Sequence, residues 1–191
     1  MTDSENLGVL CSGEFFGPDE RLGLIAEMRD APRYPASITN KGEYSVNPGV
    51  RNTSRVRVTP SAQDLVLRSL IELKPRLESR FGRSLGECQE PQFLAYSKGH
   101  FFRAHRDRGG PQEPEHVGKR SLSVVILLNP GDYDGGVLVL HDMGVPGSKM
   151  EIKGRPGGFI AFHPLELHEV TPVTRGERYS VASWFERPRG T

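Results

Sequence analysis

Short apolar runs fill the second half of the chain, and turns that contain glycine and proline separate them. Runs rich in aromatic and β-branched residues between such turn signals are typical of β-strands. The pattern predicts strands at residues 92–97, 120–128, 136–141, 158–162, 168–170 and 179–185. Many short strands of this kind favour an antiparallel sandwich or barrel.

Two stretches in the first half have the apolar spacing of amphipathic helices. The first begins at Pro18, with acidic residues in its first turn, and ends near Asp30. The 34–57 segment that follows it predicts loops and short strands, and residues 7–11 predict a further short strand. We expect both helices to pack on the outside of a sheet.

The second helix has recognisable start and stop signals. It follows Thr59-Pro60, and Ser61 and Asp64 have the spacing of a capping box. Gly82 is a candidate C-cap. Pro75 is expected to kink or split the helix, because proline removes one backbone hydrogen bond.

The chain of 191 residues is expected to form a single domain over residues 1–191, with helical support from 18–82 and a β core at about 90–187. The net charge of +1 gives no reason to expect a nucleic-acid or membrane partner. No apolar run approaches membrane-spanning length, and the polar start at residues 1–6 is unlike a signal peptide. With Cys11 and Cys88 expected as reduced thiols, we predict a cytoplasmic protein.

Three residues have the chemistry of a metal centre. His105 and Asp107 form an H-x-D pair at the end of a run with strand character, where side chains two apart point to the same side. His168 can supply a second imidazole. Two histidines and one carboxylate on one face of a metal make the facial triad of non-haem Fe(II) oxygenases. We therefore predict an oxygenase of this type that uses 2-oxoglutarate.

Each of these signals has an ordinary alternative when it is taken alone. An H-x-D pair recurs by chance, and a single histidine is more often hydrogen-bonded than metal-bound. The combination with Arg178, ten residues after His168, is harder to explain in that way. The other four histidines, His100, His116, His141 and His163, are expected to be surface or hydrogen-bonded residues.

Arg178 is the candidate partner of the cosubstrate's far carboxylate. A guanidinium binds a carboxylate through two parallel hydrogen bonds, and Ser180 lies on the same side of the strand. The charges of Fe(II), Asp107, 2-oxoglutarate and Arg178 cancel, so that a buried site carries no uncompensated charge. The alternative for Arg178 is a surface ion pair with Glu177 or Glu186.

From about Phe93 to Trp184 the chain resembles the Fe(II)/2-oxoglutarate dioxygenases, specifically their prolyl-4-hydroxylase-like branch. The resemblance covers roughly half of the chain and rests on motifs in combination. These are Tyr96 with Gly99 and Phe102 before His105-Arg106-Asp107; Arg120-Ser121-Leu122-Ser123 before Leu127-Leu128-Asn129; Tyr133-Asp134-Gly135-Gly136-x-Leu138; Gly157 through Phe162; and His168-x-Val170-x-Pro172-Val173-x-x-Gly176-x-Arg178-x-Ser180-x-x-x-Trp184.

The resemblance implies a double-stranded β-helix (jelly-roll) core with helices that support one sheet. It implies His105, Asp107 and His168 on iron and Arg178 on 2-oxoglutarate, with Ser180 and Tyr96 as further cosubstrate contacts. Some prolyl hydroxylases carry lysine where this chain has Arg178, which leaves the sub-branch open. For Tyr96 and Trp184 a role in the core is the alternative.

The activity implied is a hydroxylation with oxygen from O2, coupled to release of succinate and CO2 from 2-oxoglutarate. Ascorbate is a further candidate cofactor. The leading hypothesis is a prolyl residue in a peptide or protein as substrate; a free amino acid or small metabolite is the second, and a non-catalytic metal-binding jelly-roll protein the third. A demethylase of alkylated nucleic acid fits poorly, because such enzymes carry a second arginine where this chain has Trp184.

Three residues are candidate substrate contacts. They are Arg51 in an arginine-rich loop, Arg108 next to a candidate ligand, and Trp184. The 108–119 segment after the ligand pair contains glycine and proline residues, which are typical of either a mobile lid or an ordinary solvated connection.

Overall fold

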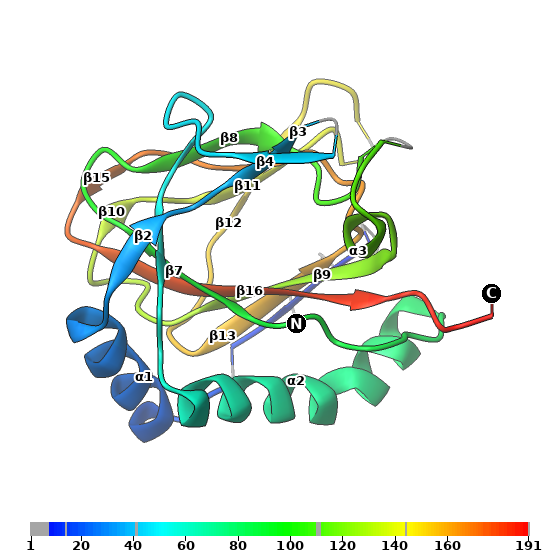
Figure 1. Cartoon of the computed structure of the whole chain (residues 1–191), viewed down its shortest axis with the longest axis horizontal. Coiled ribbons are helices and arrows are strands. Elements are labelled where there is room, and N and C mark those ends of the chain that lie inside the picture. The colour runs from blue at the N-terminus through cyan, green and yellow to red at the C-terminus, as the bar shows by residue number, and fades with distance from the viewer. Residues whose placement is uncertain (1–7, 14, 41, 110–111, 144, 191) are drawn as a thin grey trace.

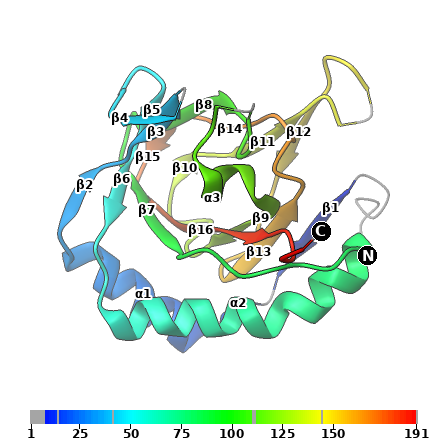
Figure 2. The ribbon, with the colours of Figure 1, turned by 45° about the vertical axis from the view of Figure 1, so that its right-hand side comes forward.

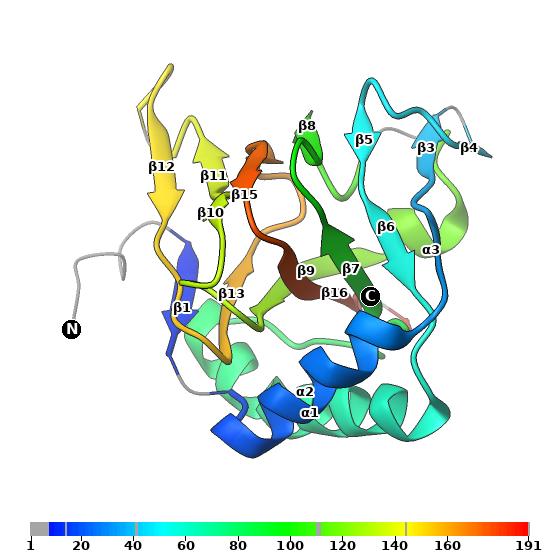
Figure 3. The same ribbon diagram turned by 90° about the vertical axis from the view of Figure 1, so that its left-hand side faces the viewer.

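Two antiparallel sheets lie face to face, and two helices cover the outer side of the larger sheet (Figures 1 and 3). The computed structural model describes residues 8–13, 15–40, 42–109, 112–143 and 145–190. This arrangement confirms the predicted architecture, mainly β with supporting helices. The 1–6 segment lies outside the described residues.

The larger sheet has seven strands, and every pairing between neighbours is antiparallel. Its order is β1 (Val9–Ser12), β13 (Gly158–Phe162), β9 (Arg120–Leu127), β16 (Arg178–Glu186), β7 (Gln92–Tyr96), β6 (Ser54–Val56) and β2 (Arg33–Pro35). The first-half segment that was expected to be support therefore also contributes strands to this sheet.

The smaller sheet has five strands, also antiparallel throughout. Its order is β12 (Lys149–Ile152), β11 (Leu138–His141), β14 (His168–Val170), β8 (Phe101–His105) and β5 (Arg51–Asn52). Two small two-stranded sheets complete the described strands: β10 (Asp134–Gly135) with β15 (Val173–Arg175), and β3 (Ile38–Asn40) with β4 (Glu43–Ser45). A four-residue helix, α3 (Glu115–Gly118), precedes β9 (Figure 2).

Side chains of the large sheet alternate between two separate cores, as the period of two along a strand requires. In β9, Leu122, Val124 and Ile126 face the helices. Leu127 belongs instead to the core between the sheets, with inward residues of β11 and β14. The same alternation in β16 turns Tyr179 and Val181 toward the helices, so Arg178 and Ser180 face the opposite sheet.

The helices bury one apolar stripe each against the large sheet. In α1 (Pro18–Asp30) the stripe is Leu24, Ile25 and Met28. In α2 (Pro60–Phe81) it is Ala62, Val66, Leu70 and Leu77. These buried side chains fix the helices on the outer face, away from the gap between the sheets (Figure 3).

The ends of α2 differ in part from expectation. The N-cap is Thr59, whose hydroxyl accepts a hydrogen bond from Ala62 N at 3.3 Å, so the proposed capping box at Ser61 is wrong. Pro75 lies inside a helix that continues for 22 residues, so the expected split does not occur. Gly82 is confirmed as the C-cap, with a left-handed φ of 60°.

Most predicted strands are present with ends that differ by one or two residues. The expected strand 136–141 begins at Leu138, because Gly135 and Gly136 both have positive φ in the preceding turn. Strand β12 was not predicted, since its lysine and glutamate interrupt the apolar pattern. No helix in the described part of the chain is long and apolar enough to span a bilayer. The thiols of Cys11 and Cys88 are both free.

Candidate active site

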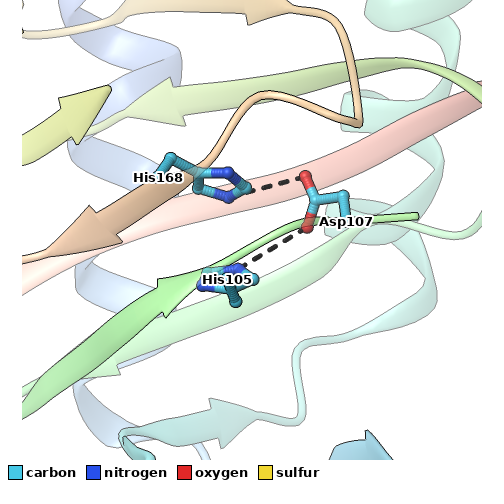
Figure 4. Close-up of side chains that lie close together, drawn as sticks. All are labelled: His105, Asp107 and His168. Atoms are coloured by element: carbon cyan, nitrogen blue, oxygen red, sulfur yellow. Dashed lines mark ion pairs between the residues drawn. The ribbon is translucent and has the colours of Figure 1, made fainter. Parts of the chain in front are cut away.

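The two candidate metal-binding histidines stand directly opposite each other on neighbouring strands. His105 ends β8 and His168 begins β14, and the antiparallel register pairs these two residues. Residues paired in this way project to the same face of a sheet. Their ring centroids are 4.2 Å apart, and both rings lie beside the Asp107 carboxylate (Figure 4).

Backbone hydrogen bonds orient both imidazoles. His105 Nδ1 lies 2.9 Å from the Arg103 carbonyl oxygen, and His168 Nδ1 lies 2.9 Å from the Glu166 carbonyl oxygen. With Nδ1–H donating to a carbonyl in each ring, Nε2 carries the lone pair that a metal requires. The stacked ring of Phe102, at 3.5 Å between centroids, further fixes His105.

Asp107 completes the group from just beyond the end of β8. Its Oδ1 lies 3.7 Å from His105 Nε2 and its Oδ2 lies 3.7 Å from His168 Nε2 (Figure 4). The expectation that Asp107 shares a regular strand with His105 is not met, since β8 ends at His105. The carboxylate nevertheless lies beside both imidazoles.

Two further residues hold Asp107 in place. Ser123 Oγ donates a hydrogen bond to Asp107 Oδ2 at 2.7 Å, and Arg120 Nη1 donates to the Asp107 carbonyl oxygen at 2.9 Å. Sequence reasoning assigned neither residue a role. An available signal was Ser123 itself, a polar residue flanked by Leu122 and Val124 in a predicted strand.

The electrostatics of the group favour the protonation states that bind a cation. Burial opposes ionisation of Asp107, but the neighbouring His168, His105 and Arg120 favour its carboxylate and hold its pKa well below the usual range. Burial and the neighbouring His105 lower the pKa of His168 to about 4. At neutral pH this leaves a carboxylate beside a neutral imidazole.

The donor set fits a ferrous ion. One ligand atom from each of His105, Asp107 and His168 lies within 4.8 Å of the other two. Their side chains are 20%, 10% and 6% exposed, so an ion here would be largely shielded from water. Two imidazoles and a carboxylate match the facial triad in type and number. The structure brings the three residues together as predicted, and their role as metal ligands stays a prediction.

Arg178 lies inside the sandwich with only 1% of its surface exposed. It donates a hydrogen bond from Nη1 to Ser180 Oγ at 2.6 Å, and its guanidinium stacks on the Tyr96 ring at 4.9 Å. Its Nε is buried without a hydrogen-bond partner among the described residues. The alternative of a surface ion pair is therefore excluded; Glu177 instead pairs with Arg33 at 2.6 Å.

A buried arginine with a free donor requires an acceptor, because an unsatisfied buried donor is costly. The far carboxylate of 2-oxoglutarate would meet that requirement. Gly136 makes room for the side chain: a Cβ at this residue would approach Arg178 Cδ to 2.9 Å. Gly136 also has a φ of +58°, so both its backbone and its neighbour favour glycine.

One cavity of about 510 Å³ connects these features. Its walls include the three candidate ligands, Arg178, Ser180 and Tyr96. A volume of this size accommodates a cosubstrate and part of a substrate. The metal group, the arginine and the space between them therefore form one continuous site.

The three candidate substrate contacts lie in different places. Arg51 and Trp184 line the cavity, and Trp184 Nε1 is buried without a partner among the described residues. Arg120 stacks on the Trp184 ring at 3.6 Å. Arg108 is absent from the lining among the described residues, and its Nη1 donates to the Arg120 carbonyl oxygen at 2.7 Å. Residues 110 and 111 of the proposed lid lie outside the described part of the chain.

None of the other four histidines belongs to the candidate ligand group in the described part of the chain. His116 lines the cavity and its Nε2 lies 2.8 Å from the Tyr44 hydroxyl. His141 pairs with Glu169 at 3.1 Å, and His163 Nδ1 accepts a hydrogen bond from Leu165 N at 3.3 Å. His100 Nδ1 is buried, with no hydrogen-bond partner in the described residues.

Comparison with known proteins agrees with this geometry. Residues 91–186 match the model of the 2OG-Fe(II) oxygenase superfamily. A PKHD-type hydroxylase of Paraburkholderia phytofirmans is 34% identical over 174 residues, which cover 87% of this chain and 74% of that protein. Another from Paraburkholderia xenovorans is 36% identical over 147 residues, and the match spans 74% of this chain but 61% of that relative's length.

Solved structures show the same fold. A prolyl-4-hydroxylase of Pseudomonas putida superposes with a TM-score of 0.76 at 27% identity, over 97% of this chain and 96% of that one. A Trichoplax adhaerens prolyl hydroxylase, solved with a peptide fragment of a hypoxia inducible factor oxygen degradation domain, has a TM-score of 0.73 at 18% identity, over 94% and 84% of the chains.

These matches cover both the β core and the residues around the cavity, and they confirm the expected jelly-roll core. The family acts with Fe(II), 2-oxoglutarate and O2 on an organic substrate. The chain therefore belongs to the 2OG-Fe(II) oxygenase superfamily, in its prolyl-4-hydroxylase-like branch, and is a 2-oxoglutarate-dependent dioxygenase.

Proposed function

We propose that this enzyme hydroxylates a prolyl residue in a peptide or protein. The observation that carries the proposal is a convergent histidine–aspartate–histidine group that shares one cavity with a buried, unpaired arginine. The likeness to a Pseudomonas putida prolyl-4-hydroxylase supports the prolyl substrate.

In this proposal each residue has a separate task. His105, Asp107 and His168 would hold Fe(II), and the contact of each histidine Nδ1 with a backbone carbonyl leaves Nε2 free to bind the ion. Arg178 and Ser180 bind the far carboxylate of 2-oxoglutarate, and the Tyr96 ring supports the guanidinium. The bound iron and cosubstrate supply O2 activation, with release of succinate and CO2.

The two sheets that enclose the cavity also supply apolar parts of its wall. Apolar residues of both sheets, among them Leu94, Leu138 and Val170, line the space around the group. A water-poor site strengthens the electrostatic contacts of Arg178 and Asp107 and limits side reactions.

The proposal is tested by incubation of the protein with Fe(II), 2-oxoglutarate, air and a set of proline-containing peptides. We expect succinate to form only with iron and O2, and a peptide to gain the mass of one oxygen at proline. Ascorbate is a candidate reductant and is added in a parallel series, where it should prolong turnover. Cosubstrate turnover that persists after removal of iron would refute the assignment.

His168→Ala should abolish iron-dependent succinate formation, because it removes one of three ligands. The matched control is His163→Ala, a nearby histidine whose ring bonds only to backbone in the described structure. Isothermal titration with Mn(II) should show lost binding for the first variant and normal binding for the second. Full activity of His168→Ala would remove it from the ligand set.

Hydroxylation of a free amino acid or small metabolite is the second candidate. It is favoured by the arginines that line the cavity, among them Arg51, which suit a small anion. A non-catalytic metal-binding role does not account for the buried Arg178. The cytoplasm is the proposed compartment, on the ground of two free thiols.

A further inference from the structure

Arg51 is a second arginine in the cavity wall that has no anionic partner. It begins β5 at the side of the small sheet, and no carboxylate among the described residues forms an ion pair with it. Its Nε is buried without a hydrogen-bond partner within the described structure. Unlike Arg178, it has no role in the proposed cosubstrate site.

The contacts of Arg51 hold its guanidinium toward the metal group. Nη1 donates to the Ser37 carbonyl oxygen at 2.8 Å, and Nη2 lies 3.5 Å from Gln92 Oε1. The guanidinium stacks on the Phe102 ring at 4.7 Å, and the other neighbour of that ring is His105 at 3.5 Å. One aromatic ring therefore separates Arg51 from a candidate iron ligand.

The charges around the cavity point to an anion at this wall. The lining contains five arginines, Arg51, Arg55, Arg106, Arg120 and Arg178, but only two carboxylates, Asp107 and Glu113. The charges of iron, Asp107, 2-oxoglutarate and Arg178 would cancel one another. The other charged residues of the wall then leave it with a net positive charge. A cleft lined with charge of one sign concentrates ligands of the opposite sign.

The unsatisfied groups of the wall strengthen the same conclusion. Arg51 Nε and Trp184 Nε1 are both buried donors without partners among the described residues. Neither atom can accept a hydrogen bond, so the ligand that satisfies them must supply acceptors. Burial also lowers the pKa of Arg51, which reflects the cost of a cation without a counter-charge.

We propose that Arg51 determines specificity by binding a carboxylate of the substrate. The inference rests on the proposed function and names the substrate class: a molecule with a carboxylate a few bonds from the carbon that is hydroxylated. Such a group comes from a free amino acid, from the C-terminus of a peptide, or from an acidic side chain next to proline. All three offer two acceptor oxygens to the Arg51 guanidinium.

The experiment compares acids with their amides on the protein loaded with Mn(II) and 2-oxoglutarate. The pairs are L-proline and L-prolinamide, glycyl-L-proline and its amide, and a blocked peptide with Pro-Asp against the same peptide with Pro-Asn. We expect the acid of at least one pair to bind about tenfold or more tightly than its partner. The pair that responds identifies the source of the carboxylate.

Variants assign the preference to Arg51. Arg51→Gln should lower the affinity for the acid to that of the amide, while Arg51→Lys should keep part of the preference because it keeps the charge. Arg57→Gln is the matched control, since Arg57 also stacks on an aromatic ring, that of Tyr34 at 6.0 Å, but is not part of the described cavity wall. It should keep the full preference.

Three results would overturn the inference. In the first, no acid binds more tightly than its amide, or none binds at all. In the second, Arg51→Gln, with a normal melting temperature, retains the preference. In the third, Arg51→Gln lowers the affinity for 2-oxoglutarate and not the affinity for the acid. Iron-dependent succinate formation is measured in parallel. If succinate forms but no acid is preferred over its amide, only this inference is refuted. If no succinate forms, the proposed function is refuted.

Discussion

Ser123 shows how a single hydroxyl sets the geometry of the candidate metal centre. Its hydrogen bond to Asp107 Oδ2, at 2.7 Å, fixes the rotation of the carboxylate. The other oxygen, Oδ1, faces His105 Nε2. Residues that orient a ligand in this way commonly change metal affinity although they never touch the ion.

We expect Ser123→Ala to weaken Fe(II) binding about tenfold, because the carboxylate loses its orientation. Anaerobic titration of the iron-free protein measures the dissociation constant. The control is Ser183→Ala, a buried serine whose hydroxyl donates to the Gln89 carbonyl oxygen at 2.7 Å. An unchanged iron affinity in Ser123→Ala would show that Asp107 is held by other contacts.

Arg178→Ala should raise the KM for 2-oxoglutarate about tenfold to a hundredfold, since hydrogen bonds to a charged group are lost. Mn(II) affinity should stay near normal, because the arginine does not belong to the metal group. Arg175→Ala serves as the control, an exposed arginine on β15 that pairs with Asp134 at 2.6 Å. An unchanged dependence on cosubstrate would place the carboxylate elsewhere.

At the scale of single residues, the sequence predicts the position of a side chain where that position follows from local rules. Arg178 and Ser180 are two apart on one strand, so a shared face follows directly from the strand period. Ser123 could not be assigned in the same way, because its partner is 16 residues away and the contact depends on how two segments meet. The packing of Arg178 against Gly136 has the same long-range origin.

At the scale of elements, the end of β10 and the turn that follows it lie against Arg178. Gly135 and Gly136 both adopt positive φ there. A Cβ on Gly136 would approach Arg178 Cδ to 2.9 Å and Val173 Cγ2 to 3.0 Å. Glycine at this residue therefore leaves room for the Arg178 side chain.

We expect Gly136→Ala to lower stability and to raise the KM for 2-oxoglutarate, because it adds a clash with Arg178 to backbone strain. Gly82→Ala provides the control: its φ of 60° is nearly the same, but nothing lies within 4 Å of the added Cβ. Thermal denaturation should show a lower melting temperature for both variants than for the wild type. Only Gly136→Ala should raise the KM for 2-oxoglutarate. Equal KM values in the two variants would contradict the clash with Arg178.

Helix α2 shows where local rules fail at this scale. Pro75 should interrupt a helix, yet Leu70 and Leu77 on either side are both buried in the core beneath the large sheet. Tertiary packing of this apolar stripe outweighs the local cost of proline. Strand β12 escaped prediction for a related reason, since its place in the sheet comes from pairing with β11 and not from its composition.

At the scale of the molecule, a cluster around Glu177 ties the first strand after α1 to the β core. Arg33 of β2 donates to Glu177 Oε1 at 2.6 Å, and Ser97 Oγ donates to the same atom at 2.8 Å. The Tyr179 hydroxyl donates to Oε2. Burial alone would raise the pKa of Glu177, but these hydrogen bonds outweigh it and lower the pKa to about 2.

A folded-state pKa below the unfolded value stabilises the protein only while the carboxyl is ionised in both states. The contribution of Glu177 is therefore complete above its unfolded pKa of about 4.3 and is lost as the pH falls toward about 2. Urea unfolding at a series of acidic pH values should show a shallower loss of stability in Glu177→Gln than in the wild type.

The control for this series is Glu87→Gln, whose exposed carboxylate pairs with Arg189 at 2.8 Å. Exposed ion pairs contribute little to stability, so its pH profile should follow the wild type. A Glu177→Gln profile that also follows the wild type would show that the cluster does not stabilise the fold.

The two candidate histidine ligands and Arg178 lie on opposite sheets of the sandwich. His105 and His168 belong to the small sheet, while Arg178 projects from the large one. Packed sheets keep a separation of about 10 Å, which their interlocked side chains do not allow to vary freely. The separation of the two sheets would therefore limit the length of the 2-oxo acid that can bind between them. If iron and Arg178 hold the two ends of the acid, we expect oxaloacetate, one carbon shorter, and 2-oxoadipate, one carbon longer, to support less turnover than 2-oxoglutarate.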